Sequence, residues 1–328
     1  MTVQHQYISL DKPTEWRQAL SGIRHSFGHT WESCYAMHLT TGLKTYLYCF
    51  ESDQGRAVCP ICEREYQGTI DLVKPFGFSG FVGTGDCTGL DSYWKESARE
   101  RGYVCGFLGL NPLFDFSSHF DAAEVQQYDT IHVFDLTLTM EQLFSNLHRS
   151  RQRELKGWDS QNPAFTCDVA ALKAFFLEQY TAFLQARHAE SFYFFSDETL
   201  LCLMNLENIK LVGAQTNGKV VAVMVFVYTP HTADALFTLS LPAGRSYTIP
   251  LIWYGVNHFK SLQIPNLNLG GGGGGGVGES KRRYGCDVYP LSCLKQVYQP
   301  EIYENLCQQA GVEQDSSCGY FPAYRKPA

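Results

Sequence analysis

The chain has 328 residues, of which 45% are apolar, 18% charged and 14% aromatic. These proportions are typical of a folded protein and argue against a disordered one, and the length predicts two domains. The net charge of −7 argues against broad adhesion to nucleic acid or to an anionic membrane.

The N-terminus and the hydropathy pattern predict a cytoplasmic protein without membrane insertion. The first residues lack the basic-then-apolar pattern of a signal peptide, and the longest apolar run, 220–228, is about half a bilayer span. The twelve cysteines are scattered along the chain. Without an export signal, we expect them to be reduced thiols.

The N-terminal part predicts a helix over 16–23, after Pro13 and the capping residue Thr14, and then strands at 45–50, 57–62 and 69–73. Cys59 and Cys62 have the C-x-x-C spacing, but no second Cys/His pair follows at ligand spacing. On a strand these two side chains would face opposite sides. We therefore expect structural cysteines and no metal site.

Residues 139–142 form a capping-box pattern that predicts a helix with Leu143 and Leu147 on one face. The pattern is expected to continue into a basic stretch, which contains Arg149, Arg151, Arg153 and Lys156. This stretch is either a solvated helix end or an anion-binding site for phosphates.

A second helix is predicted after Asp168, with apolar residues at three-to-four spacing and Tyr180 on the same face. Three strands are expected to follow at 211–214, 220–228 and 233–240. The Asn217-Gly218 turn between the first two indicates an antiparallel hairpin.

The loop 241–250 leads from the last of these strands into an amphipathic helix. A helix N-terminus presents unpaired N–H groups to an anion, and a guanidinium pairs with phosphate in a bidentate fashion. Gly244 and Arg245 are therefore candidates for binding a pyrophosphate. The alternative is an ordinary exposed loop arginine.

A short strand at 266–269 is followed by the glycine tract, which we define as residues 270–276, then by Lys281 and a last helix near 301–309. The tract is either a flexible linker or the wall of a site. A lysine ammonium next to it could stabilise a developing oxyanion, because glycines allow close backbone approach. The alternative interpretation of Lys281 is a solvated basic turn.

Four stretches together resemble the GNAT-like superfamily that contains the Fem aminoacyltransferases and the Fem-like small N-acyltransferases. They are Leu267-Asn-Leu-Gly-Gly-Gly with Lys281-Arg-Arg-Tyr284-Gly, Tyr180 through Arg187 to Tyr193-Phe-Phe-Ser196, Lys74-Pro-Phe-Gly-Phe-Ser-Gly80 with 106–113, and 319–325. Three features depart from the family pattern. Ser280 replaces the first aromatic of the Phe-Lys-x-x-Phe segment, Gly109 stands where many relatives have arginine, and the glycine tract is longer than usual.

The resemblance implies an α+β fold of two tandem GNAT-like (acyl-CoA N-acyltransferase) domains with mixed, largely antiparallel sheets flanked by helices. The expected halves are 1–138 and 139–328, the second carrying the donor site. The implied function is N-acyl transfer from acyl-CoA (acetyl-CoA) to the amine of a small acceptor, such as an amino sugar or an amino acid derivative, by direct attack. The alternatives are an aminoacyl-tRNA-dependent Fem-type transferase and a catalytically silent GNAT-like binding module.

The same resemblance assigns the candidate site residues. The catalytic candidates are Lys281 and Tyr284; the cofactor-binding candidates are Gly244, Arg245, Gly270, Gly271 and Gly272; the substrate-binding candidates are Phe78, Tyr180, Arg187 and Tyr193. No general base is identifiable, since neither Glu279 nor His188 has a spacing that fixes its geometry. The sequence carries no signal for the oligomeric state.

Overall fold

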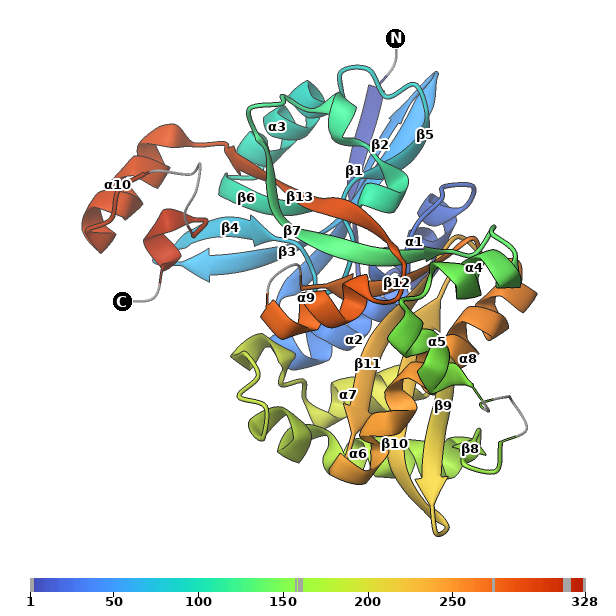
Figure 1. The fold of residues 1–328 in the computed structure, drawn as a ribbon. Coiled ribbons are helices and arrows are strands. Elements are labelled where there is room, and N and C mark those ends of the chain that lie inside the picture. The colour runs from blue at the N-terminus through green and yellow to red at the C-terminus, as the bar shows by residue number, and fades with distance from the viewer. Residues whose placement is uncertain (1–2, 157, 159–161, 273–274, 315–319, 327–328) are drawn as a thin grey trace. The chain divides into compact units, whose positions relative to one another are not determined.

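The computed structural model describes residues 3–156, 158, 162–272, 275–314 and 320–326 (Figure 1). Its contacts divide the chain into two compact units, one formed by Met1–Tyr128 with Pro290–Ala328 and the other by Asp129–Tyr289. These bounds differ from the predicted halves 1–138 and 139–328. The difference arises because the C-terminal segment pairs with the first unit, through strand β13 (Asp287–Val297) against β6 (Tyr103–Leu110).

The first unit contains a sheet with the strand order β1-β2-β3-β4-β6-β13, in which β5 also pairs with β3. Its pairs are antiparallel except for β4 with β6. Its other elements are β1 (Val3–Ser9), α1 (Pro13–Leu20), η1 (Phe27–His29), α2 (Trp31–Thr41), β2 (Lys44–Ser52), β3 (Gly55–Tyr66), β4 (Thr69–Val73), β5 (Val82–Gly85), α3 (Leu90–Glu100), η2 (Pro112–Phe114), η3 (Ser117–His119), α10 (Pro300–Ala310) and η6 (Ala323–Arg325).

The second unit contains strands in the order β7-β12-β11-β10-β9-β8. Here too one pair is parallel, β11 with β12, and the rest are antiparallel. Its elements are β7 (Val125–Asp135), which begins in the first unit, α4 (Met140–Asn146), α5 (Arg149–Leu155), β8 (Phe165–Thr166), α6 (Val169–Gln185), η4 (Ser191–Tyr193), α7 (Asp197–Met204), β9 (Ile209–Thr216), β10 (Lys219–Tyr228), β11 (Ala233–Ser240), η5 (Pro242–Tyr247), α8 (Thr248–Ser261), β12 (Asn266–Gly271) and α9 (Gly275–Arg282).

The parallel strands of the second unit pair over a short length only. Their ladder consists of Ala233↔Leu267 and Asp234↔Asn268. Both strands run on in the same direction, β11 to Ser240 and β12 to Gly271. Beyond Asp234 and Asn268, the two strands make no further ladder pairs with each other among the described residues.

Helices cover both faces of the second unit's central strands (Figure 1). Alternate residues of β10, such as Met224 and Phe226, share a buried cluster with Ile252 and Phe259 of α8. On the opposite face, the Leu172 side chain of α6 lies directly over Gly213 of β9. A side chain at 213 would collide with Leu172, so this strand position needs glycine for close packing of the helix.

The predicted fold class is confirmed: the structure is α+β, with mixed, largely antiparallel sheets flanked by helices. The hairpin turn is also as predicted, because Asn217 and Gly218 both have positive φ, at 52° and 73°, as this tight turn requires. The capping box is present in full, with Gln142 N donating to Thr139 Oγ1 at 3.2 Å and Thr139 N donating to Gln142 Oε1 at 2.8 Å.

Several details of the predicted elements were wrong or missing. The first helix spans Pro13–Leu20 rather than 16–23, and its N-cap residue is Lys12 instead of Thr14. The helix that starts after Thr139 does not continue into the basic stretch, because Leu147 takes an extended conformation (ψ 140°) and a new helix, α5, begins after His148. Strand β13 was not predicted.

No described helix is long and apolar enough to cross a membrane.

Candidate active site

The first three glycines of the tract form a turn at the end of β12. The side chains of Asn268, Asp129 and Lys281 each hydrogen-bond to its backbone. Gly270 N donates to Asn268 Oδ1 at 2.8 Å, and Gly272 N donates to Asp129 Oδ2 at 3.1 Å. Lys281 Nζ donates to the carbonyl oxygen of Gly271. Because two of the three N–H groups already bond within the protein, this arrangement supports a rigid wall more than a cradle for phosphate.

Backbone conformation favours glycine at two of these positions, and crowding by a side chain favours it at the third. Gly270 and Gly272 have φ of 81° and 112°, in the region that other residues seldom adopt. At Gly271, an added Cβ would lie 2.7 Å from Asp129 Oδ2. The next part of the tract, residues 273 and 274, lies outside the described residues, and the flexible-linker interpretation of that part stays a prediction.

Lys281 lies in the last turn of α9 and is partly buried. Burial lowers the pKa of its ammonium to about 8, while the nearby Asp129 carboxylate opposes this shift. The lysine therefore remains mostly protonated at pH 7, in an environment with less water than a surface lysine has. This setting is suited to stabilising a developing negative charge.

His132 on β7 is the second titratable group beside Lys281. Its side chain is 1% exposed, and neither ring nitrogen has a hydrogen-bond partner among the described residues. Burial and the nearby Lys281 and Arg282 lower the pKa of its imidazole, so the ring is neutral at pH 7. Two unpaired buried nitrogens are unusual in a folded protein and are most often explained by a bound water, ion or ligand.

Asp234 and Asn268 lie opposite each other at the last paired position of β11 and β12. Asn268 Nδ2 donates to Asp234 Oδ1 at 2.9 Å, and the other end of the Asn268 amide accepts from Gly270 N. Both side chains are buried. A hydrogen-bonded path therefore leads from this carboxylate to the glycine turn.

Two predicted substrate-binding tyrosines are joined to each other. Tyr180 OH donates to the carbonyl oxygen of Tyr193 at 2.6 Å, and the Tyr180 ring is 3% exposed against Phe176 and Phe237. Tyr193 is 39% exposed; burial raises the pKa of its hydroxyl, and the nearby Asp129 carboxylate adds to the rise. Tyr193 thus lies near the Lys281 site, and Tyr180 holds its backbone.

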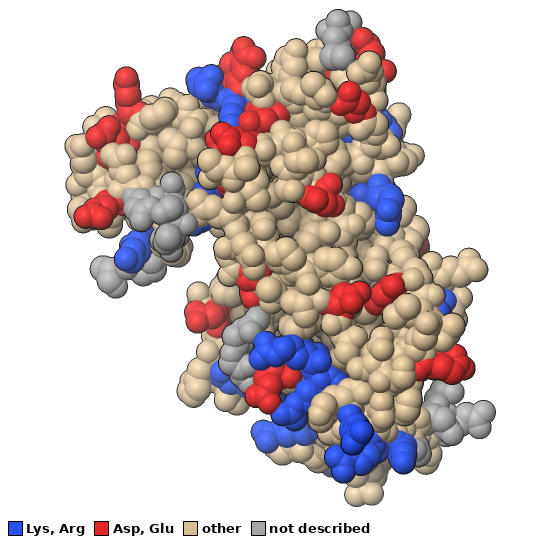
Figure 2. All heavy atoms as spheres, turned by 45° about the horizontal axis from the view of Figure 1, so that its top comes forward, with Lys and Arg blue, Asp and Glu red and all other residues tan. Residues whose placement is uncertain are grey.

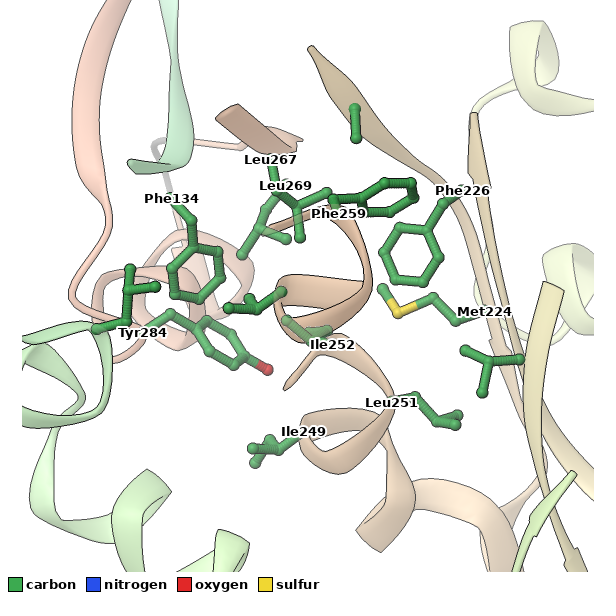
Figure 3. Close-up of a cluster of buried hydrophobic side chains, with 14 of the residues drawn as sticks. Phe134, Met224, Phe226, Ile249, Leu251, Ile252, Phe259, Leu267, Leu269 and Tyr284 are labelled. Carbon is green, nitrogen blue, oxygen red and sulfur yellow. The ribbon is translucent and has the colours of Figure 1, made fainter. Parts of the chain in front are cut away.

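Tyr284 lies in the hydrophobic core of the second unit. It is 5% exposed, with its ring 6.2 Å from that of Phe134 (Figure 3). The Arg151 guanidinium lies 5.1 Å from the centre of the Tyr284 ring. Burial raises the pKa of its hydroxyl to about 12. These contacts favour a packing role, in which Tyr284 fixes the end of α9 behind Lys281.

The predicted pyrophosphate loop is a short 3-10 helix, η5, that leads directly into α8. Gly244 is buried, and a Cβ there would lie 2.2 Å from the carbonyl oxygen of Val221, so packing against β10 accounts for this glycine. Arg245 is exposed. Of the two, only Arg245 presents a group that a phosphate could reach.

The remaining two predicted residues have no contact with this group among the described residues. Arg187 is exposed just after α6, with its guanidinium 4.4 Å from the Phe183 ring. Phe78 belongs to the first unit, where its carbonyl oxygen accepts from Ser26 Oγ and from Asn111 Nδ2. Gly109, where many relatives have arginine, is covered by Ser79 O and by the Lys74 side chain.

The structure thus brings together Lys281, Tyr193 and Gly270–Gly272, and adds residues that the sequence did not indicate. They are Asp129, His132, Asp234 and Asn268. The one available signal was a carboxylate and an amide inside apolar strands, at Asp234 and Asn268. Among the described residues there is no group of three or more His, Cys, Asp or Glu placed to hold a metal ion.

No family model matches this sequence, and no curated protein matches it at a significant level. Solved structures do match the fold. A crystal structure of FemX is 9% identical, with a TM-score of 0.67 over 92% of this chain and 99% of that chain. A conserved protein of unknown function from Bacteroides thetaiotaomicron is 11% identical, with a TM-score of 0.61 over 90% of this chain and 100% of that one.

A third match is the C-terminal domain of a putative lysylphosphatidylglycerol synthetase from Agrobacterium fabrum. It is 13% identical, with a TM-score of 0.55 over 91% of this chain and 96% of that chain. At these identities the likeness shows the fold. The predicted Fem-like, GNAT-like fold is therefore confirmed.

Proposed function

We propose that this protein transfers an acyl group from acyl-CoA to the amine of a small acceptor, such as an amino sugar or an amino acid derivative, by direct attack of the amine on the thioester. The observation that carries the proposal is the environment of Lys281. Its partly buried ammonium is held at the glycine turn beside Asp129. Placed near the thioester carbonyl, it would stabilise the oxyanion that forms during attack.

The parting of β11 and β12 supports the same proposal. Beyond Asp234 and Asn268, the facing edges of the two strands make no further ladder pairs with each other among the described residues. An extended ligand with amide groups can pair with such an edge as an added strand would. The pantetheine arm of coenzyme A has two amides, and it would bring its thioester toward the glycine turn and Lys281. Arg245 is our candidate for contacting the phosphates.

The alternative donor, aminoacyl-tRNA, is favoured by one specific observation. Residues 148–156 and 279–283 contain seven basic and two acidic residues, within a chain of net charge −7. The two segments touch, since Arg151 Nη2 donates to Ser280 Oγ at 2.9 Å and His148 N donates to Arg283 O at 3.0 Å. Lys and Arg side chains gather in the lower part of Figure 2, where elements of the second unit are drawn.

Binding measurements on the full chain distinguish the two donors. We expect acetyl-CoA to bind by calorimetry, and to bind equally well to an Arg149→Gln, Arg153→Gln variant, since both arginines are exposed at α5. A tRNA complex whose affinity falls steeply between about 50 and 200 mM salt, and that is weakened in this variant, would instead favour the aminoacyl-tRNA donor. Absence of both would point to the silent binding module.

A further inference from the structure

Asp234 is a buried carboxylate with no cationic partner among the described residues. It is 7% exposed, and within that part of the chain it accepts one side-chain hydrogen bond, from the neutral amide of Asn268 at 2.9 Å. Burial raises its pKa to about 7, and the Asn268 bond opposes this rise. A carboxylate is costly to bury without a charged partner, and such groups are concentrated at functional sites.

The first unit contains a buried carboxylate with a purely structural role, Asp71, which can be compared with Asp234. Asp71 is fully buried, but it accepts from Arg64 at 2.7 Å, from Arg325 at 2.6 Å and from Tyr324 OH at 3.0 Å. Its charge is thus compensated by two guanidinium groups. Asp234 has no such compensation, so a stabilising role does not explain its presence.

The position of Asp234 is the second argument. It occupies the last paired position of β11, where that strand and β12 begin to part. Through Asn268 it connects to Gly270 N, one residue from the carbonyl that Lys281 binds. By strand alternation, Asp129 of β7 lies on the same sheet face as Asp234. Tyr180 of α6 contacts Phe237 on that face, and its hydroxyl binds the carbonyl oxygen of Tyr193.

We propose that Asp234 is the general base of the transfer reaction, accepting the proton of the attacking amine at its Oδ2 atom. This inference rests on the proposed function. The amine nitrogen forms a bond to the carbonyl carbon, and its proton passes to Asp234. The bond from that carbon to the leaving group then breaks, and the proton is delivered to the departing thiolate, or to the departing oxygen of an ester donor.

The test is Asp234→Asn, which keeps the shape and the oxygen that accepts from Asn268 but cannot take up a proton. We expect kcat to fall by about 100-fold or more. We also expect the acid limb of the wild-type pH–rate profile, with its midpoint near pH 7, to disappear. A second readout is the melting temperature of both proteins between pH 4 and pH 8.

The sign of the stability effect separates a catalytic role from a structural one. A carboxyl group whose pKa is raised on folding loses its proton first in the unfolded chain, so the wild type loses stability as pH rises from about 4 to about 7. The variant lacks this loss. We therefore expect Asp234→Asn to melt higher than the wild type at pH 8 while being far less active.

Asp71→Asn is the matched control, because it removes a buried carboxylate that the mechanism does not use. We expect a lower melting temperature and an unchanged pH–rate profile. An active wild type with an equally active Asp234→Asn variant, or a variant that keeps the acid limb, overturns the base assignment alone. A wild type inactive with every donor overturns the proposed function and the base assignment together.

Discussion

At the scale of single residues, the proposed chemistry depends on how Lys281 is surrounded. The sequence indicated this lysine through its place after the glycine tract, but it did not indicate which groups would shift the pKa of its ammonium. Asp129 lies about 150 positions earlier in the chain and reaches the site because β7 pairs with β12. A contact between such distant residues comes from sheet topology, which local patterns do not specify.

The Lys281–Asp129 pair gives a prediction about titration. The carboxylate of Asp129 raises the pKa of Lys281, against the effect of burial. In Asp129→Asn the opposing charge is lost while an oxygen remains to accept from Gly272 N. We therefore expect the pKa of Lys281 to fall below about 8. Competitive labelling of lysines across a pH series, read by mass spectrometry, measures this value.

The other lysines of the same sample serve as internal references for that experiment. A labelling midpoint for Lys281 that stays unchanged or moves upward in Asp129→Asn would show that the two groups do not interact as described.

Tyr284 shows the limit of assigning a role from residue type. A tyrosine three residues after Lys281 can hydrogen-bond a substrate or can pack in the core, and the sequence pattern is the same for both. Its ring lies between Phe134 and the Arg151 guanidinium. Arg151 in turn pairs with Glu154 at 3.2 Å. The basic stretch of α5 therefore serves partly to hold α9 in place.

At the scale of elements, the sequence predicted best where a local rule decides the structure. The capping residues Thr139 and Asp168 and the Asn217-Gly218 turn all act through hydrogen bonds or φ values within a few residues. Strand β13 was missed because its identity depends on pairing with β6, which is distant in sequence. The break at Leu147 was missed for the same kind of reason, as His148 N bonds to Arg283 O.

The glycine turn gives a prediction at this scale. Gly271 has an ordinary φ, so a substitution there tests crowding against Asp129 Oδ2, which lies 2.7 Å from the position of an added Cβ. We expect Gly271→Ala to destabilise the protein by about 1–3 kcal/mol, measured by denaturant unfolding. The transfer rate should also fall, because the turn holds Lys281 through the Gly271 carbonyl.

Gly218→Asn is the control for that substitution. Gly218 has φ of 73° with nothing within 4 Å of an added Cβ, and asparagine tolerates this conformation. We expect a change within about 0.5 kcal/mol. If Gly271→Ala were as well tolerated as Gly218→Asn, the close contact of the turn with Asp129 would be contradicted.

At the scale of the whole molecule, composition and length were enough to predict two folded units, and the motif order was enough to predict their fold. The boundary between the two units was not predictable from local sequence. The C-terminal segment contributes Leu294, Gln296 and Tyr298 to the first unit, where Trp94 Nε1 donates to Gln296 Oε1 at 2.8 Å. Local sequence patterns do not indicate that this C-terminal segment packs with the N-terminal unit.

The candidate residues were likewise predicted unevenly. Most of the site residues lie in the second unit, whose glycine turn, lysine and strand edges adjoin one another. Phe78 is in the first unit, in a loop organised by Ser26 and Asn111. A role for it in binding the acceptor stays a prediction from the family resemblance.

Amine-dependent release of free thiol from acyl-CoA tests the central claim most directly. It should be measured for the wild type, for Lys281→Met, and for Lys219→Met, a control at the exposed hairpin turn. We predict thiol release that requires an amine, is unchanged in Lys219→Met, and falls about 10²–10³-fold in Lys281→Met, the loss expected when an oxyanion-stabilising group is removed. A wild type that releases no thiol with any acyl-CoA and amine, or a Lys281→Met variant as active as the wild type, would contradict it.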